Sequence, residues 1–214
     1  MTEILHSVSA YFLQLPWLEL IAMLLSLAYV ILAAKGNLWC WPAAFISTAL
    51  YTVIFFDVKL LMDSALSAYY LLMAVYGYWQ WTNPTTRDDN SPEGLSVISW
   101  SLSLHIKICF ALAVITLALG YFIANYTSAH FPYLDTFTTV FAVFSTYLVT
   151  QKVLENWLYW IVIDLVSIYL YVEKGLIPTT VLFVIFVVVA CYGYIKWLKI
   201  YQQTSKDLIT APKS

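Results

Sequence analysis

The chain has 214 residues, of which 62% are hydrophobic and only 10% are charged, and its mean hydropathy is +0.80. A soluble domain carries about 25% charged residues, so this composition excludes an ordinary soluble protein and predicts an all-α integral membrane protein. The net charge of −2 comes without any block of Lys or Arg, so the sequence indicates no nucleic-acid partner.

Residues 1–15 predict a short helix that lies in the membrane interface rather than crossing the bilayer. Ile4, Val8 and Tyr11 recur at helical spacing on one face. Thr2 is a suitable N-cap, and Pro16 separates this helix from the next segment. We expect no cleavable signal peptide, because the first residues lack a basic start and a small-residue cleavage site.

Seven apolar runs follow, and each predicts a transmembrane helix. A helix needs about 20 residues to cross the bilayer, and about 17 suffice. The predicted spans are 17–34, 38–56, 60–81, 100–124, 133–150, 157–172 and 177–198. The longest polar loop is 85–94, and a polar tail follows the last span.

Lys and Arg are divided unequally between the two sides of the membrane. The side that receives two of the ten has Lys59 and Lys174, and the other eight fall on the opposite side. Because cytoplasmic loops are enriched in Lys and Arg, we predict a cytoplasmic C-terminus and an outside N-terminus. The eight are Lys35, Arg87, Lys107, Lys152, Lys196, Lys199, Lys206 and Lys213.

Two short motifs recur in the same order along the chain. Segment 37–41 resembles 156–160 at a separation of 119 residues, and 76–81 resembles 192–197 at a separation of 116. We therefore predict a 3+1+3 parallel repeat, a plan in which substrate is held in a central cavity between the halves. The resulting segments are a first repeat at 16–82, a cytoplasmic loop and linker helix at 83–131, a second repeat at 132–200 and a cytoplasmic tail at 201–214.

Asp164 is the strongest individual signal for a binding site. An ionisable residue near the middle of a span is costly in lipid and should face a cavity or a partner. Asn156, Trp160 and Ser167 share its helix face, at spacings that place side chains one above another. The alternative is that Asp164 only bonds a neighbouring helix. The corresponding positions of the first repeat are Asn37, Trp41, Phe45 and Thr48, so only one half would carry the acid.

Further candidates come from two other spans. Thr146 belongs to a threonine stripe that has Tyr147 and Gln151 beside it, and Tyr76 and Gln80 share a face of span 60–81. Helix packing explains such stripes about as well as binding does, and the neighbouring amides favour a cavity wall.

The tryptophans divide into two groups. Trp41 and Trp160 lie a turn inside their spans in matching contexts and are the better site candidates. The others at span ends, Trp17, Trp81, Trp100 and Trp197, are expected to belong to the aromatic belt at the membrane interface.

No pattern in the sequence predicts catalysis, a metal site or a cofactor. Cys40, Cys109 and Cys191 match no metal spacing and are expected to be small buried hydrophobes. The histidines, His6, His105 and His130, have no Ser or Cys partner for nucleophilic chemistry, and no phosphate-binding loop is present. We therefore expect a protein that is not an enzyme.

Together these motifs resemble the PnuC family of nicotinamide riboside transporters. The resemblance covers residues 17–200 and rests on Asn37…Trp41, on Leu61…Tyr70 running into Tyr76-Gly-Tyr-Trp-Gln-Trp81, and on Asn156…Trp160…Asp164. It implies uptake of nicotinamide riboside across the bacterial inner membrane by facilitated diffusion, with a cytoplasmic riboside kinase that traps the product. It also implies that Trp160 and Asp164 contact the ligand.

The residues suit that ligand, which carries a positive pyridinium ring, an amide and a ribose. A Trp face attracts a desolvated cation by about 2 kcal/mol, and Asp164 could neutralise it or accept ribose hydroxyls. The amides of Asn156, Gln151 and Asn37 could bond the carboxamide or the sugar. We expect the mononucleotide to be rejected, because its phosphate would meet Asp164 with no Arg in any span core.

Other functions remain open on the sequence alone. The main alternative is a SWEET-like facilitator of a sugar or another small neutral solute, which would share the fold. A membrane enzyme or a sensor is disfavoured by the lack of catalytic clusters and soluble domains. Coupling to protons through Asp164 stays open, and lipid-facing aromatic stripes favour a homo-oligomer.

Overall fold

The structure, a computed structural model, describes residues 17–57, 59, 61–83, 96–127 and 130–210. Within these residues the chain is helical, and its single isolated bridge joins Ile98 to Val153. The predicted interfacial helix at 1–15 and the polar loop at 85–94 lie outside the described residues. The helices are α2 (Trp17–Ala34), α3 (Cys40–Asp57), α4 (Leu61–Thr82), α5 (Leu102–Tyr126), α6 (Pro132–Thr150), α7 (Asn156–Glu173) and α8 (Ile177–Thr210).

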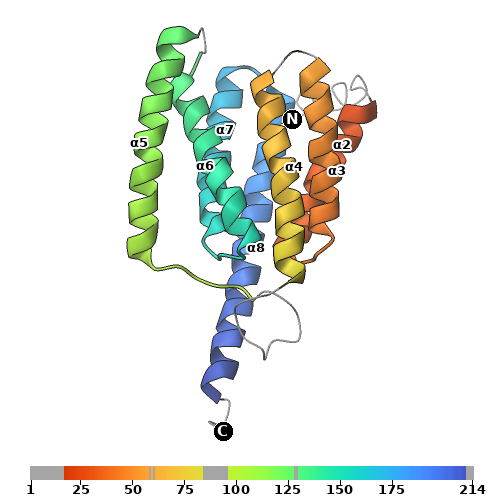
Figure 1. Ribbon diagram of the computed structural model, residues 1–214, viewed down its shortest axis with the longest axis vertical. Coiled ribbons are helices and arrows are strands. Elements are labelled where there is room, and N and C mark those ends of the chain that lie inside the picture. The colour runs from red at the N-terminus through yellow and green to blue at the C-terminus, as the bar shows by residue number, and fades with distance from the viewer. Residues whose placement is uncertain (1–16, 58, 60, 84–95, 128–129, 211–214) are drawn as a thin grey trace.

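The helix ends agree with the predicted spans to within two residues, except at the end of the chain. There α8 continues to Thr210, whereas the predicted span ends at 198. Its 34 residues extend about 51 Å, which exceeds the roughly 30 Å of hydrocarbon in a bilayer. The last part of α8 therefore projects beyond the bundle (Figure 1).

Residues in the left-handed conformation end several of the helices. Gly36 and Gly175 have φ of 69° and 70°, and Lys59 and Lys152 have φ of 62° and 50°. A left-handed residue just past a helix satisfies free carbonyls of its last turn and stops it. These turns explain why polar Lys and Gly residues mark the span boundaries in the sequence.

Four of the helices are long and apolar enough to cross a membrane, namely α2, α3, α5 and residues Thr179–Lys206 of α8. The protein is therefore a multi-pass membrane protein. The other three, α4, α6 and α7, do not meet this criterion, and each carries polar residues that the bundle buries. Examples are Ser64 and Ser67 in α4, Thr146 in α6, and Asn156 and Asp164 in α7.

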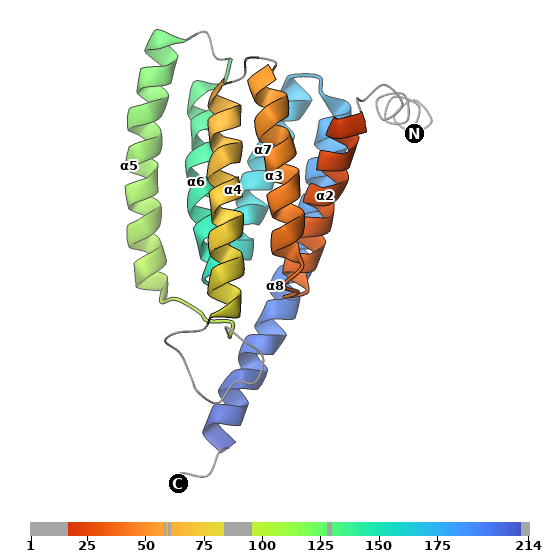
Figure 2. The same ribbon diagram turned by 45° about the vertical axis from the view of Figure 1, so that its right-hand side comes forward.

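Of the seven helices in the described residues, six pack in a closed ring and the seventh lies outside it. The ring runs α2, α3, α4, α6, α7 and α8, and α8 packs back against α2. Helix α5 stands at one edge and packs against α6 (Figures 1 and 2). Gly120 permits this contact, because a Cβ atom there would lie 2.5 Å from the ring of Tyr133. Helix α5 thus leaves the ring unbroken.

Candidate functional site

The polar face of α7 is buried, as its spacing predicts. Asn156, Asp164 and Ser167 are no more than 5% exposed, and Trp160 is partly buried one turn before the acid. The Asn156 Nδ2 donates to the carbonyl of Val153 at 2.6 Å, while its Oδ1 has no partner in the described part of the chain. An acceptor and an acid therefore share this face, two turns apart.

Asp164 is 4% exposed and forms no hydrogen bond or ion pair with any described residue. Burying a polar group without a partner costs about 1–3 kcal/mol, and more for a charged one. The alternative, in which Asp164 only bonds a neighbouring helix, is not supported, because no such bond is present in the described residues. The carboxyl is thus left available to a ligand, to water or to a proton.

Trp160 lies where the two apolar clusters of the bundle meet. It packs against the cluster that contains Trp41 and Val149, and against the one that contains Phe141 and Tyr159. Its ring is therefore shared by both clusters, on the same helix as Asp164 and one turn from it. An aromatic face beside an unpaired acid is suited to a flat cation.

The candidates on α4 and α6 separate into bonded and free groups. Gln151 Nε2 donates to the hydroxyl of Tyr76 at 3.1 Å, so these two predicted residues come together. Thr146 is buried and bonds the carbonyl of Ala142 at 2.9 Å. Tyr147 is 39% exposed, and Gln80 is partly buried.

The residues predicted to form a wall in the first half differ in their exposure. Asn37 is exposed in the turn before α3, and its Oδ1 accepts from the backbone N–H of Trp39 at 2.9 Å, because the amide caps the start of that helix. Phe45 is 43% exposed, whereas Trp41 is 2% exposed. A cavity wall formed by these residues therefore stays a prediction.

Trp41 and Trp157 each lie over a glycine of another helix. The ring of Trp41 covers Gly77, and a Cβ atom there would lie 2.3 Å from it. The ring of Trp157 covers Gly193 in the same way, at 2.7 Å. Segments 76–81 and 192–197 are 116 residues apart, and the residue 116 positions after Trp41 is Trp157. This separation was the sequence signal that could have found Trp157.

The assignment of Trp81 and Trp197 to the interfacial belt is also wrong. They are 5% and 0% exposed, because each indole packs among helices and donates a hydrogen bond to a backbone carbonyl. Trp17, by contrast, is 81% exposed and fits the belt. Position at the end of an apolar run does not distinguish these two cases.

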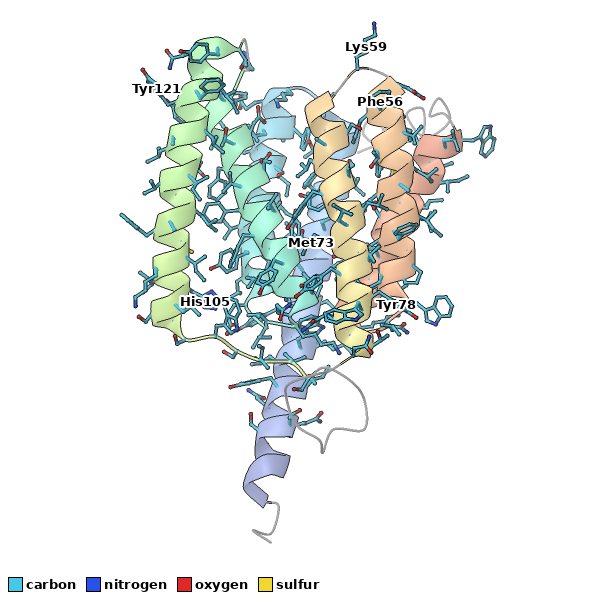
Figure 3. All side chains as sticks on the ribbon, in the orientation of Figure 1. Phe56, Lys59, Met73, Tyr78, His105 and Tyr121 are labelled. Carbon is cyan, nitrogen blue, oxygen red and sulfur yellow. The ribbon has the colours of Figure 1, made fainter. Side chains whose placement is uncertain are left out.

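Sequence reasoning also missed a polar network at the start of α7. His105, labelled in Figure 3 near the start of α5, has its Nδ1 2.9 Å from the hydroxyl of Tyr159 and its Nε2 3.5 Å from Glu155. Glu155 also accepts from the hydroxyl of Ser99 and from the backbone N–H of Trp100. These residues are far apart in the chain, so no local motif reveals them.

Residues 16–199 match the nicotinamide mononucleotide transporter family. The chain belongs to this family. It is 24% identical to the nicotinamide riboside transporter PnuC of Escherichia coli, with 86% of each chain covered. It is 27% identical to the PnuC of Haemophilus influenzae, covering 88% of this chain and 82% of that one.

Two other comparisons bear on the substrate and the fold. The riboflavin/roseoflavin transporter RibM of Streptomyces davaonensis is 24% identical, with 85% of this chain and 84% of RibM covered. A crystal structure of the vitamin B3 transporter PnuC superposes with a TM-score of 0.71 at 22% identity, covering 94% of this chain and 90% of that one. The fold is thus that of a membrane transporter, and the family is one of transporters rather than enzymes.

Proposed function

We propose that this protein carries nicotinamide riboside across the membrane by facilitated diffusion, in a central cavity bounded by the ring of helices. The observation that carries the proposal is the buried Asp164, unpaired within the described residues and one turn from Trp160. The PnuC relatives named for the same riboside support it. The sugar alternative is not favoured, since none of the relatives described above is named for a sugar.

The chemistry of α7 fits a riboside with a positive ring. The face of Trp160 would attract the pyridinium by about 2 kcal/mol, and Asp164 would neutralise it or accept its ribose hydroxyls. The free Oδ1 of Asn156 would accept from the carboxamide. The remaining wall would be formed by Trp41, Thr146, Tyr147 and Gln80, with the bonded pair Gln151 and Tyr76. The Oδ1 of Asn37 already accepts from the backbone N–H of Trp39, so only its Nδ2 would be available to the ligand.

The family is named for the mononucleotide, but the charges of this chain favour the riboside. A phosphate would approach Asp164, and α2, α3, α4, α6 and α7 contain no Lys or Arg to offset it. Like charges held together in a low-dielectric site repel strongly. We therefore keep the expectation that the mononucleotide is rejected.

A 3+1+3 parallel repeat accounts for the ring, with α2–α4 and α6–α8 as its halves. A single separation of 116 residues supports this plan. It relates both bounds of α3 to those of α7, and it relates the Gly77–Trp41 contact to the Gly193–Trp157 contact. In the contacts that close the ring, α2 meets α8 and α4 meets α6, as two-fold related halves require.

We infer the cellular setting from the family and the charge distribution. We place the protein in the bacterial inner membrane with seven spans, the N-terminus outside and the C-terminus in the cytoplasm. A cytoplasmic riboside kinase would keep the concentration gradient of the riboside directed inward. A homo-oligomer would cover exposed apolar side chains such as Phe110 and Leu72, which are 72% and 69% exposed.

A binding titration of the purified protein tests the substrate. We expect riboside binding, with affinity reduced at least about tenfold in Trp160→Ala and in Asp164→Ala. A desolvated cation–π contact contributes about 2 kcal/mol, and a hydrogen bond to a charged group contributes about 1.5–3 kcal/mol. Trp39→Ala and Glu173→Ala, which alter exposed residues, should bind normally. Unchanged affinity in both site variants would contradict the proposed binding site. Tighter binding of glucose, riboflavin or the mononucleotide would contradict the proposed substrate.

Transport into vesicles separates facilitated diffusion from proton coupling. We expect riboside uptake to follow the riboside gradient alone and to be the same with and without a proton gradient. Accumulation against the riboside gradient that depends on a proton gradient would contradict the proposed mechanism.

A further inference from the structure

Four tryptophans form a continuous cluster where α3, α4, α7 and α8 meet. The ring centroids of Trp41 and Trp81 are 5.2 Å apart, those of Trp81 and Trp197 are 6.2 Å apart, and those of Trp197 and Trp157 are 5.4 Å apart. All four are at most 5% exposed. This tryptophan cluster lies near the α2–α3 and α6–α7 turns, toward the end of the ring from which α8 projects (Figure 2).

Two of the four indoles join the halves of the ring by hydrogen bonds. Trp81 Nε1 on α4 donates to the carbonyls of Val149 and Thr150, at 3.3 and 3.2 Å, in the last turn of α6. Trp197 Nε1 on α8 donates to the carbonyl of Ala33, at 3.2 Å, in the last turn of α2. The carbonyls of Ala33 and Val149 also accept the backbone N–H groups of Gly36 and Lys152, at 2.8 and 3.1 Å, so each indole is a second donor to a carbonyl oxygen that has two lone pairs.

These two bonds are equivalent and run in opposite directions. Each starts on the third helix of one half and ends on the first helix of the other, and the 116-residue separation relates both their donors and their acceptors Ala33 and Val149. They also fall at the two contacts, α4 with α6 and α2 with α8, that close the ring. Separation of the halves at this end must therefore break both bonds.

The outer pair of indoles is held differently. The Nε1 atoms of Trp41 and Trp157 are buried and have no hydrogen-bond partner among the described residues. Packing over Gly77 and Gly193 fixes their rings instead. The hydrogen bonds that hold the cluster closed between the halves are thus made by the inner pair, Trp81 and Trp197.

From this geometry we infer that Trp81 and Trp197 are the gate residues of the transport pathway at the end where α8 projects. The assignment rests on the proposed transport function. In the closed state the four indoles fill this end of the ring, and the crossed bonds hold the halves together. Release of the riboside at this end requires the Trp81–Trp197 contact to part and both bonds to break.

Cys40 provides a reporter within the chain for this motion. Its thiol is fully buried, it precedes Trp41, and it belongs to the same apolar cluster as the four tryptophans. The test uses the full-length protein with Cys109→Ala and Cys191→Ala, in detergent, so that a maleimide can label Cys40 alone. Trp81→Phe, Trp197→Phe and their combination each retain an aromatic ring and remove the donor.

Without ligand we expect Cys40 to be labelled about fivefold faster in each single variant and about 25-fold faster in the double variant, given the usual strength of one hydrogen bond. Trp39→Phe is the matched control, because Trp39 also adjoins Cys40 but is 71% exposed, and its labelling rate should equal that of the parent. Equal rates in the parent and in folded gate variants would overturn the assignment.

A second measurement needs no tryptophan variant, so it can be made even if the variants fail to fold. Saturating riboside should change the labelling rate of Cys40 in the parent, because transport moves the gate. A rate that riboside leaves unchanged, while the riboside binds in the titration above, would overturn the gate. Failure of the riboside to bind would instead overturn the proposed substrate, and the ligand-free comparison would still decide the gate.

Discussion

At the scale of single residues, the chain keeps a group that its fold does not need. Asp164 is buried without a partner in the described residues, and such a group lowers stability. Functional sites commonly retain groups of this kind, at a cost in stability that a ligand offsets. Stability and binding should therefore respond in opposite directions to substitutions at this position.

Asp164→Leu is expected to stabilise the protein and abolish riboside binding. Removal of an unpaired buried carboxyl should raise the free energy of unfolding by about 1–3 kcal/mol, while the ligand loses its counter-charge. Thermal unfolding in detergent and the binding titration measure the two effects. Asp164→Asn, which keeps a polar group, should show a smaller gain in stability and retain part of the affinity. A clear loss of stability in Asp164→Leu would mean that the carboxyl has a structural partner.

Gly77→Ala is expected to destabilise the protein through its contact with Trp41. The new Cβ atom would lie 2.3 Å from the Trp41 ring, and overpacking of this kind costs about 1–3 kcal/mol. Gly193→Ala should act in the same way through Trp157. Thermal unfolding provides the measurement, and the Trp41→Val background is the control, where Gly77→Ala should cost little. An equal cost in both backgrounds would place the effect in the helix backbone instead.

At the scale of elements, the two halves of the ring differ in what supports their middle helix. The start of α7 is joined to α5, because His105 of α5 contacts Glu155 and Tyr159. It is also joined to the segment that precedes α5, because Glu155 accepts from the backbone N–H of Trp100. The positions 116 residues earlier than Glu155 and Tyr159 are Trp39 and Ala43, which cannot form such bonds. The helix that carries Trp160 and Asp164 is thus the one that α5 holds in place.

Tyr159→Phe is expected to loosen this attachment of α5 to α7. The change removes the hydroxyl that lies 2.9 Å from His105 Nδ1 and 3.4 Å from Cys109 Sγ, and it leaves buried polar atoms unpaired, at about 1–3 kcal/mol. We expect a lower unfolding temperature and faster hydrogen exchange in the first turns of α5. The control is Tyr126→Phe, whose ring is 73% exposed. The same exchange rates in Tyr159→Phe and wild type would show that the network does not hold α5.

At the scale of the whole molecule, the ring has two distinct ends. Lys59 lies beyond the ends of α3 and α4 at one end, and the extended part of α8 projects from the other (Figure 3). The Lys and Arg residues concentrate at the second end, which favours the cytoplasmic side. The tryptophan cluster would then face the compartment into which substrate is released.

Cysteines introduced at the two ends test this orientation in intact cells. In a chain that lacks native cysteines, Lys59→Cys should react with an impermeant maleimide, and Gln202→Cys, on the exposed extension of α8, should react only after the cells are permeabilised. The reverse pattern would invert the protein in the membrane and place the gate on the outside.

The sequence by itself determined the elements and the strongest chemical signal. Apolar runs bounded by Gly, Lys and Pro predict seven helices to within two residues at most ends, because lipid and backbone hydrogen bonding leave few other solutions. Helical spacing also placed Asn156, Asp164 and Ser167 on one buried face.

Only the tertiary structure decided which aromatic residues are buried and which polar groups meet. Trp81 and Trp197 have the same sequence signature as an interfacial tryptophan, yet their indoles bond helices 68 and 164 residues away in the chain. His105, Glu155 and Tyr159 likewise converge only because α5 packs beside α6 at the start of α7. Periodicity along a helix reports which residues share a face, but what that face touches depends on the packing of distant helices.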